Sequence, residues 1–271
     1  MMAFRRHVNA RLAMWRGAGR AALFAAAALA IPTANSASAP SPAPFENTIA
    51  QRVLACTGCH GREGRAAADG YYPRIAGKPA GYLFNQLRNF RDGRRHYELM
   101  SGLLALLGDD YLREIADHFA SLDLPYPPPL PATETAAVRA TGEALVTHGD
   151  AARGLPACTS CHGTAMTGRA PFIPGLLGLP RDYLNGQLGA WKNGKRHAQE
   201  PDCMATVATR LTQADIGAVS AWLAAQPVPI PSKAVLGAAG DRLPLNCGGV
   251  VDAPLPESAG RPGPSSAAVR R

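Results

Sequence analysis

The sequence predicts an all-α protein made of two tandem helical domains joined by a proline-rich linker. A six-residue motif occurs twice, as CTGCHG at residues 56–61 and as CTSCHG at residues 158–163. The segments that follow the two motifs also match each other, at offsets of 101 to 104 residues. Apolar residues in both copies recur with a helical period, and no convincing alternating strand pattern is present.

The repeat contains two pairs of matching amphipathic segments. Residues 82–96 (YLFNQLRNFRDGRRH) align with residues 183–197 (YLNGQLGAWKNGKRH), and residues 107–122 align with residues 211–226. Large apolar side chains recur three or four positions apart in each segment, which places them on one face of a helix and predicts core packing. These residues are Leu83, Leu87, Phe90, Leu112, Ile115 and Phe119 in the first copy, and Leu184, Leu188, Trp191, Ile216, Val219, Trp222 and Leu223 in the second.

Shorter helices are expected before each motif, at residues 46–55 and 136–147. The last helix has clear end signals. Thr212 and Asp215 have the spacing of a capping box, and Pro227 marks where the helix stops.

The N-terminal residues are typical of a secretory signal peptide. Five arginines without any acidic residue precede an apolar run at residues 21–31, and small residues follow as far as Ala39. The apolar run is well short of the roughly 20 residues that a membrane-spanning helix needs. Residues 125–131 (PYPPPLP) cannot continue a helix and predict an extended connector. The residues after 253 have the composition of a disordered tail.

The expected organisation therefore has five segments: a signal peptide (1–39), a first domain (40–124), a linker (125–135), a second domain with a C-terminal extension (136–252) and a tail (253–271). Removal of the signal peptide leaves 23 basic and 20 acidic residues. Such a small net charge, without basic runs interleaved with aromatics, argues against a nucleic-acid partner. Export also implies an oxidising compartment, in which cysteines are cross-linked or bound to a cofactor.

Both motifs have the spacing C-x-x-C-H. Two thiols three positions apart lie about one helical turn from each other, so both reach one edge of a porphyrin, and the following histidine lies under the iron. A zinc site would need a second pair of ligands, and a redox dithiol would need neither the histidine nor the second copy. We therefore expect two covalently bound heme c groups. The residues are Cys56, Cys59 and His60 for heme 1, and Cys158, Cys161 and His162 for heme 2.

The second axial ligand decides whether a heme only passes electrons or also binds small molecules. Met100 lies 40 residues after the first motif histidine, and Met204 lies 42 residues after the second. Both are favoured as ligands. The corresponding histidines His96 and His197 are the alternatives, although they follow basic turns suited to heme propionates or a partner. Met166 is too close to its motif to cross easily to the far face and is expected to be a packing residue.

Taken together, these motifs resemble the diheme class I cytochromes c of the c-four type. The resemblance covers roughly residues 45–227 and includes CTGCHG, YLFNQLRNFRDGRR, GDAARGLPACTSCHG and YLNGQLGAWKNGKR. It implies two cytochrome c-like helical domains related by a pseudo-twofold axis. It also implies the axial pairs His60 with Met100 and His162 with Met204.

The resemblance further implies a periplasmic electron carrier rather than an enzyme. It would transfer electrons between a respiratory donor and a terminal oxidase or another acceptor. The expected partners are redox proteins, namely a terminal oxidase, a cytochrome complex or a dehydrogenase, and a peripheral association with the membrane stays open. A second interpretation is a cytochrome subunit that performs the same transfer inside a larger dehydrogenase or oxidase complex.

Cys203 and Cys247 depart from that family pattern. As the two thiols left over in an exported chain, they are expected to form a disulfide next to Met204. The alternative is that Cys203 binds iron as a thiolate, as in diheme thiosulfate-oxidising enzymes. A diheme peroxidase is a further alternative, but no catalytic acid or base in the sequence supports it.

Overall fold

The computed structural model describes residues 46–67, 70–129, 131–237 and 242–250. All of them belong to one compact unit, Phe45–Arg271. The expected signal peptide at residues 1–39 and the expected tail at residues 253–271 lie outside the described residues. Within the described ranges, none of the helices combines the length and the apolar character needed to span a membrane.

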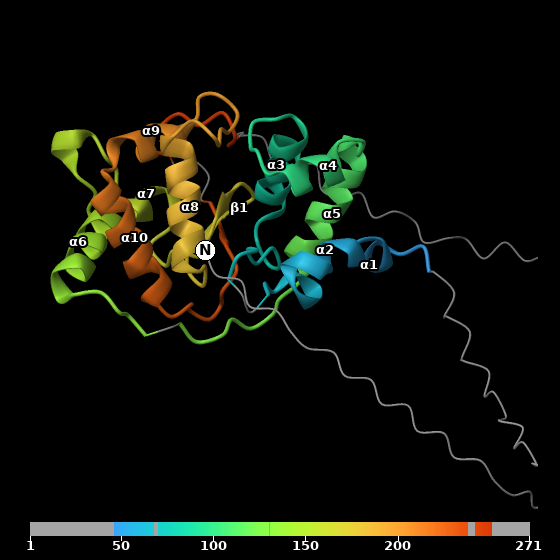
Figure 1. The fold of residues 1–271 in the computed structure, drawn as a ribbon, viewed down its shortest axis with the longest axis horizontal. Coiled ribbons are helices and arrows are strands. Elements are labelled where there is room, and N and C mark those ends of the chain that lie inside the picture. The colour runs from blue at the N-terminus through green and yellow to red at the C-terminus, as the bar shows by residue number, and fades with distance from the viewer. Residues whose placement is uncertain (1–45, 68–69, 130, 238–241, 251–271) are drawn as a thin grey trace, which may run out of the picture. The chain divides into compact units, whose positions relative to one another are not determined.

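The first copy is helical, as predicted (Figure 1). Its helices are α1 (Ile49–Arg52), α2 (Leu54–His60), α3 (Ala80–Arg91), α4 (Glu98–Leu104) and α5 (Asp109–Ser121), with a 3-10 turn (Arg62–Gly64) after α2. Helices α3 and α5 pack against each other, and α4 packs on α3.

The second copy repeats this arrangement. Its helices are α6 (Ala136–Thr147), α7 (Cys158–His162), α8 (Arg181–Lys192), α9 (Cys203–Arg210) and α10 (Gln213–Ala225), with a 3-10 turn (Ala151–Arg153) before α7. Helix α10 packs on both α6 and α8, as Figure 1 shows. The predicted capping box is confirmed, because Thr212 and Asp215 exchange hydrogen bonds with each other's backbone N–H groups.

A small sheet in the second copy was not predicted from the sequence. Strand β1 (Gly168–Ala170) lies between β2 (Ile173–Pro174), to which it is antiparallel, and β3 (Val235–Leu236), to which it is parallel. Strands of two or three residues are too short to show an alternating pattern, which explains why the sequence did not reveal them.

Each copy has its own apolar core. The core of the first copy includes Leu112 and Phe119, which are 0% and 2% exposed, and the core of the second includes Ile216 and Leu223, at 0% and 1%. The helix faces predicted from the sequence are therefore the buried ones. Separate cores favour two domains, although the exact domain bounds remain predictions.

The linker is extended and contacts both copies. Its Tyr126 ring lies under the guanidinium of Arg74, with Cζ 3.9 Å from the ring centre. Arg74 also donates hydrogen bonds to the carbonyls of Leu124 and Pro125. The ring also packs against Gly178 of the second copy, where an added Cβ would lie 2.4 Å from it. The linker thus packs against both copies through the side chain of Tyr126.

Helices α6 and α10 cross at a point where only glycine fits. A Cβ added to Gly142 would lie 2.2 Å from the carbonyl oxygen of Ala218, closer than atoms can approach. Gly142 lies in α6, and Gly217 lies in α10 next to Ala218. A Cβ added to Gly217 would have no atom within 4 Å. An added methyl group would therefore clash at Gly142 but fit at Gly217.

We predict that Gly142→Ala lowers the free energy of unfolding by about 1–3 kcal/mol, because the added methyl group pushes two core helices apart. Gly217→Ala is the matched control and should raise stability by up to about 1 kcal/mol, since alanine is a better helix former. Denaturant unfolding of the heme-loaded protein, followed by far-UV circular dichroism, measures both. Equal stability of the two variants would contradict the close crossing.

Candidate heme-binding sites

The two cysteines of each motif share one face of a short helix. Cys56 and Cys59 lie in α2, and Cys158 and Cys161 lie in α7, so both pairs have the i, i+3 spacing of one helical turn. In both copies the helix ends at the motif histidine, because the next residue is a glycine with positive φ (74° and 80°). In each motif the two thiols therefore lie in a short helix whose last residue is the histidine.

Both motif histidines are held in the tautomer that binds a metal. The Nδ1 of His60 lies 2.8 Å from the carbonyl oxygen of Pro73, and the Nδ1 of His162 lies 2.8 Å from that of Pro174. A carbonyl only accepts hydrogen bonds, so Nδ1 carries the proton in each ring. Nε2 is then left with a free lone pair, which is the usual state of a histidine that ligates iron.

Burial keeps these rings neutral. Each histidine is 8% exposed, and desolvation lowers the pKa of both side chains, against the opposing effect of the proline carbonyls. A nearby cation lowers each pKa further: Arg95 acts on His60, and Lys78 acts on His162. The neutral imidazole required for metal ligation therefore prevails at neutral pH.

The motif thiols lack the character of a redox dithiol. Burial raises the pKa of Cys158 to about 11, with the neighbouring Cys161 as a second cause, and burial also raises the pKa of Cys56. Catalytic C-x-x-C pairs instead have lowered thiol pKa values. The buried surroundings of these cysteines are suited to uncharged sulfur atoms in contact with an apolar group.

A cavity of about 1890 Å³ is bordered by both motifs. A site for one small molecule usually has about 300–1,000 Å³, so this volume corresponds to roughly two such sites. His60 and Met100 line it in the first copy, and His162 and Met204 line it in the second. The predicted ligands of each heme thus face the same space.

The alternative ligands are placed less favourably. Both His96 and His197 are exposed, and the Nε2 of His197 lies 3.0 Å from the carbonyl oxygen of Gly194. Met166 is 3% exposed inside the core of the second copy, which confirms its expected packing role.

A symmetric polar network joins the two copies at the cavity wall. The guanidinium of Arg95 donates to the side-chain oxygens of Gln86 (3.0 Å) and Gln187 (2.7 Å), and that of Arg196 donates to Gln187 (2.6 Å) and Gln86 (2.8 Å). Burial, with Arg95 as the next cause, lowers the pKa of Arg196 to about 10, so the guanidinium of Arg196 stays charged at neutral pH. No carboxylate of the described residues forms an ion pair with either arginine.

Sequence reasoning missed the two glutamines, although a signal was present. Gln86 and Gln187 occupy the same position in the aligned segments, as do Arg95 and Arg196. A polar residue that recurs inside an amphipathic helix of both copies needs a partner. Here that partner is the cation of the other copy, a contact that no single segment predicts.

Comparison with known proteins places the chain in a family. The model of the family "Cytochrome c" matches residues 140–226. The thiosulfate dehydrogenase electron acceptor of Thiomonas intermedia (strain K12) is 40% identical over 177 residues, which is 65% of this chain and 80% of that protein. The structure of reduced recombinant cytochrome c4 from Pseudomonas stutzeri is 31% identical, with a TM-score of 0.55, and the match covers 64% of this chain and 93% of that one. The chain belongs to the cytochrome c4 family.

A second solved structure is a larger protein. The thiosulfate dehydrogenase (TsdBA) from Marichromatium purpuratum, in its as-isolated form, is 33% identical, with a TM-score of 0.57. The match covers 64% of this chain but only 36% of that chain. The cytochrome c4 chain described here therefore resembles one part of that protein.

Cytochromes of this family carry heme c, and the residues of this c4 chain fit such a group. The indole Nε1–H of Trp191 is buried on the cavity wall and has no hydrogen-bond partner among the described residues. Arg95 and Arg196 border the same cavity without a carboxylate. Bound propionates would supply acceptors for the indole and anions for the two cations.

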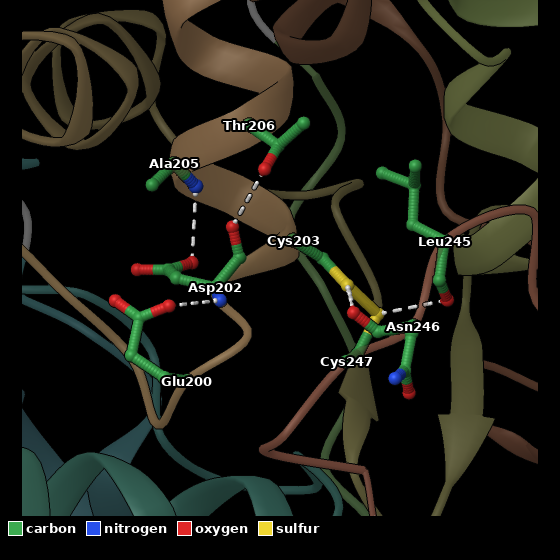
Figure 2. The surroundings of a disulfide bond; sticks show 8 residues. All are labelled: Glu200, Asp202, Cys203, Ala205, Thr206, Leu245, Asn246 and Cys247. Atoms are coloured by element: carbon green, nitrogen blue, oxygen red, sulfur yellow. Dashed lines mark hydrogen bonds between the residues drawn. A yellow bond between two sulfur atoms is a disulfide. The ribbon is translucent and has the colours of Figure 1, made fainter.

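The c4 chain also has a disulfide beside one predicted iron ligand (Figure 2). Cys203, the first residue of α9, is joined to Cys247 in the C-terminal extension, with a Cα–Cα distance of 5.3 Å. Asp202 caps the same helix by accepting a hydrogen bond from the backbone of Ala205 at 3.0 Å. Met204 is thus next to both a covalent cross-link and a helix cap.

Removal of this disulfide should weaken both the fold and the position of Met204. In the chain-entropy model, a closed loop of this length contributes about 4 kcal/mol. We predict that Cys203→Ser/Cys247→Ser loses about that much unfolding free energy. The far-red absorption of the ferric protein, which reports methionine ligation, should also decrease.

The single variant Cys247→Ser is the matched control, because it breaks the same bond without changing α9. Both Cys247→Ser and Cys203→Ser alone should reproduce the loss of far-red absorption expected of the double variant. Unchanged methionine ligation in both single variants would show that the disulfide does not restrain the ligand.

Proposed function

We propose that the chain is a periplasmic electron carrier with two covalently attached heme c groups. Heme 1 would be attached at Cys56 and Cys59, and heme 2 at Cys158 and Cys161. The axial pairs would be those expected from the sequence, a motif histidine and a methionine in each copy. When bound, heme c supplies a one-electron couple, and a thioether ligand favours its reduced form relative to a second imidazole.

One observation carries this proposal. In each copy the motif histidine has its Nδ1 fixed by a proline carbonyl, while a methionine borders the same cavity. The repeated geometry provides two candidate ligands of different types for each iron. Methionine is favoured over histidine as the second ligand because His96 and His197 are exposed.

The chain itself would contribute position and shielding. Buried leucine and aromatic side chains of α3, α5, α8 and α10 border the cavity and would shield a bound heme from water. The helices that carry the two methionines are short, and the disulfide and cap at α9 restrain one of them. Ligands held in this way need little rearrangement when an electron arrives or leaves.

The enzymatic alternative with a thiolate ligand has less support. The sulfur of Cys203 is bonded to that of Cys247 and is therefore not available as a thiolate. If a histidine and a methionine occupy both axial positions of each iron, no position is left for a substrate. This is the state expected of an electron carrier.

A thiosulfate-oxidising dehydrogenase is the proposed electron donor. The Thiomonas relative is named an electron acceptor of thiosulfate dehydrogenase, and the Marichromatium structure contains a similar region within such an enzyme. Electrons would then pass to a terminal oxidase or another acceptor. A stable subunit of a larger complex would have the same chemistry but would copurify with its partner.

The ligand assignment predicts spectra. We expect two hemes per chain by the pyridine hemochrome assay, far-red absorption in the ferric state and no binding of carbon monoxide in the ferrous state. Met100→Ala and Met204→Ala should each open one iron, so that each variant binds about one carbon monoxide per chain. His96→Ala and His197→Ala are the controls and should bind none. Carbon monoxide binding by the unmodified protein would contradict a pure carrier.

The donor assignment predicts a dependence on a second protein. Thiosulfate with a catalytic amount of a thiosulfate dehydrogenase should reduce both hemes, as followed by the visible absorption of ferrous heme c. Thiosulfate alone should reduce neither. Rapid reduction by thiosulfate without the dehydrogenase would instead support the enzymatic alternative.

A further inference from the structure

Lys78 is a buried cation without a carboxylate partner among the described residues. It is 5% exposed, and its Nζ donates a hydrogen bond to the carbonyl oxygen of Gly175, in the other copy, at 3.0 Å. The charged and titratable groups near it are Arg74, Tyr126 and His162. Burial and the neighbouring Arg74 lower the pKa of Lys78 to about 8, so it remains mainly protonated at neutral pH.

The position does not require a lysine for folding. At the repeat offset of 101, Leu179 occupies the equivalent place in the second copy and is itself 8% exposed. The same turn of the fold thus accepts an apolar side chain. Burial of a charge without an ionic partner costs free energy that leucine would not cost. A role other than stability would explain the lysine.

The contact places the charge close to the heme 2 ligand of the other copy. Gly175 directly follows Pro174, whose carbonyl oxygen accepts the hydrogen bond from Nδ1 of His162. A cation near an iron centre favours the reduced state, which has one positive charge less.

We propose that Lys78 of the first copy raises the reduction potential of the heme bound at His162 in the second copy. The inference rests on the proposed heme sites. Arg95 lies near His60, but it has a counterpart, Arg196, in the other copy. Lys78 has no cationic counterpart in the second copy, so its charge would affect the two hemes differently. An electron on heme 2 would thus be stabilised by a residue of the neighbouring copy.

The test is a potentiometric titration of the heme-loaded protein near neutral pH, followed by visible absorption. Lys78→Leu copies the second repeat and should lower the midpoint potential of heme 2. The shift should correspond to a change on the order of tenfold in the equilibrium between its oxidised and reduced forms. The heme 1 couple should not move. Met204→His, which lowers the heme 2 couple by replacing its thioether, assigns the two couples.

Three further variants make the test specific. Lys78→Gln removes the charge but keeps a donor for Gly175, and it should shift heme 2 even if the leucine variant folds poorly. Lys78→Arg keeps the charge and should restore the original potential. Arg210→Leu removes an exposed cation of the second copy that does not border the cavity, and it should have little effect.

The outcomes separate this inference from the carrier proposal. If both couples are present and neither moves in the leucine and glutamine variants, or if both fall equally, the role of Lys78 is overturned and the carrier stands. If the chain takes up no heme in the hemochrome assay, both proposals fail. A fall confined to heme 2 and reversed by arginine supports the inference.

Discussion

The hydrogen bond from each motif histidine to a proline carbonyl is the interaction on which the rest of the site depends. The bonds of His60 to Pro73 and of His162 to Pro174 select the tautomer and fix rings that border the cavity, with Nε2 unprotonated. The helix before each ring must end there, which requires a glycine with positive φ. Residues of the core helices and of the methionine-bearing helices border the same cavity as these two rings.

The interface of the two copies has an unusual distribution of charge. Arg95, Arg196 and Lys78 are all buried, and their polar contacts within the described residues are to neutral oxygens, on glutamine, tyrosine and backbone. Buried cations cost free energy unless an anion or a redox centre compensates for them. The two arginines can pair with the carboxylates of a bound cofactor. Lys78 has no counterpart in the second copy, so it can make the reduction potentials of the two hemes differ.

The C-terminal extension has a structural role that its composition did not suggest. Lys233 donates hydrogen bonds to the last carbonyls of α5 in the first copy, and the carbonyl of Gly249 accepts one from Asn85 in α3. The same extension forms β3 in the second copy and is cross-linked to Cys203. It therefore holds both copies, in addition to the linker that contacts both through Tyr126.

The sequence by itself determined the repeat, the helical class, the core faces and the residues suited to heme, because helical period and motif spacing are local properties of the chain. Leu112, Phe119, Ile216 and Leu223 could be placed in the cores for this reason. Only the tertiary structure decided the proline partners of the histidines, the short sheet, the shared glutamines and the burial of Lys78. Each of these depends on which segments of the chain meet in space, from 12 residues apart for His162 and Pro174 to 110 for Arg196 and Gln86 in the case of the hydrogen bonds, and a periodic pattern contains no information about such contacts.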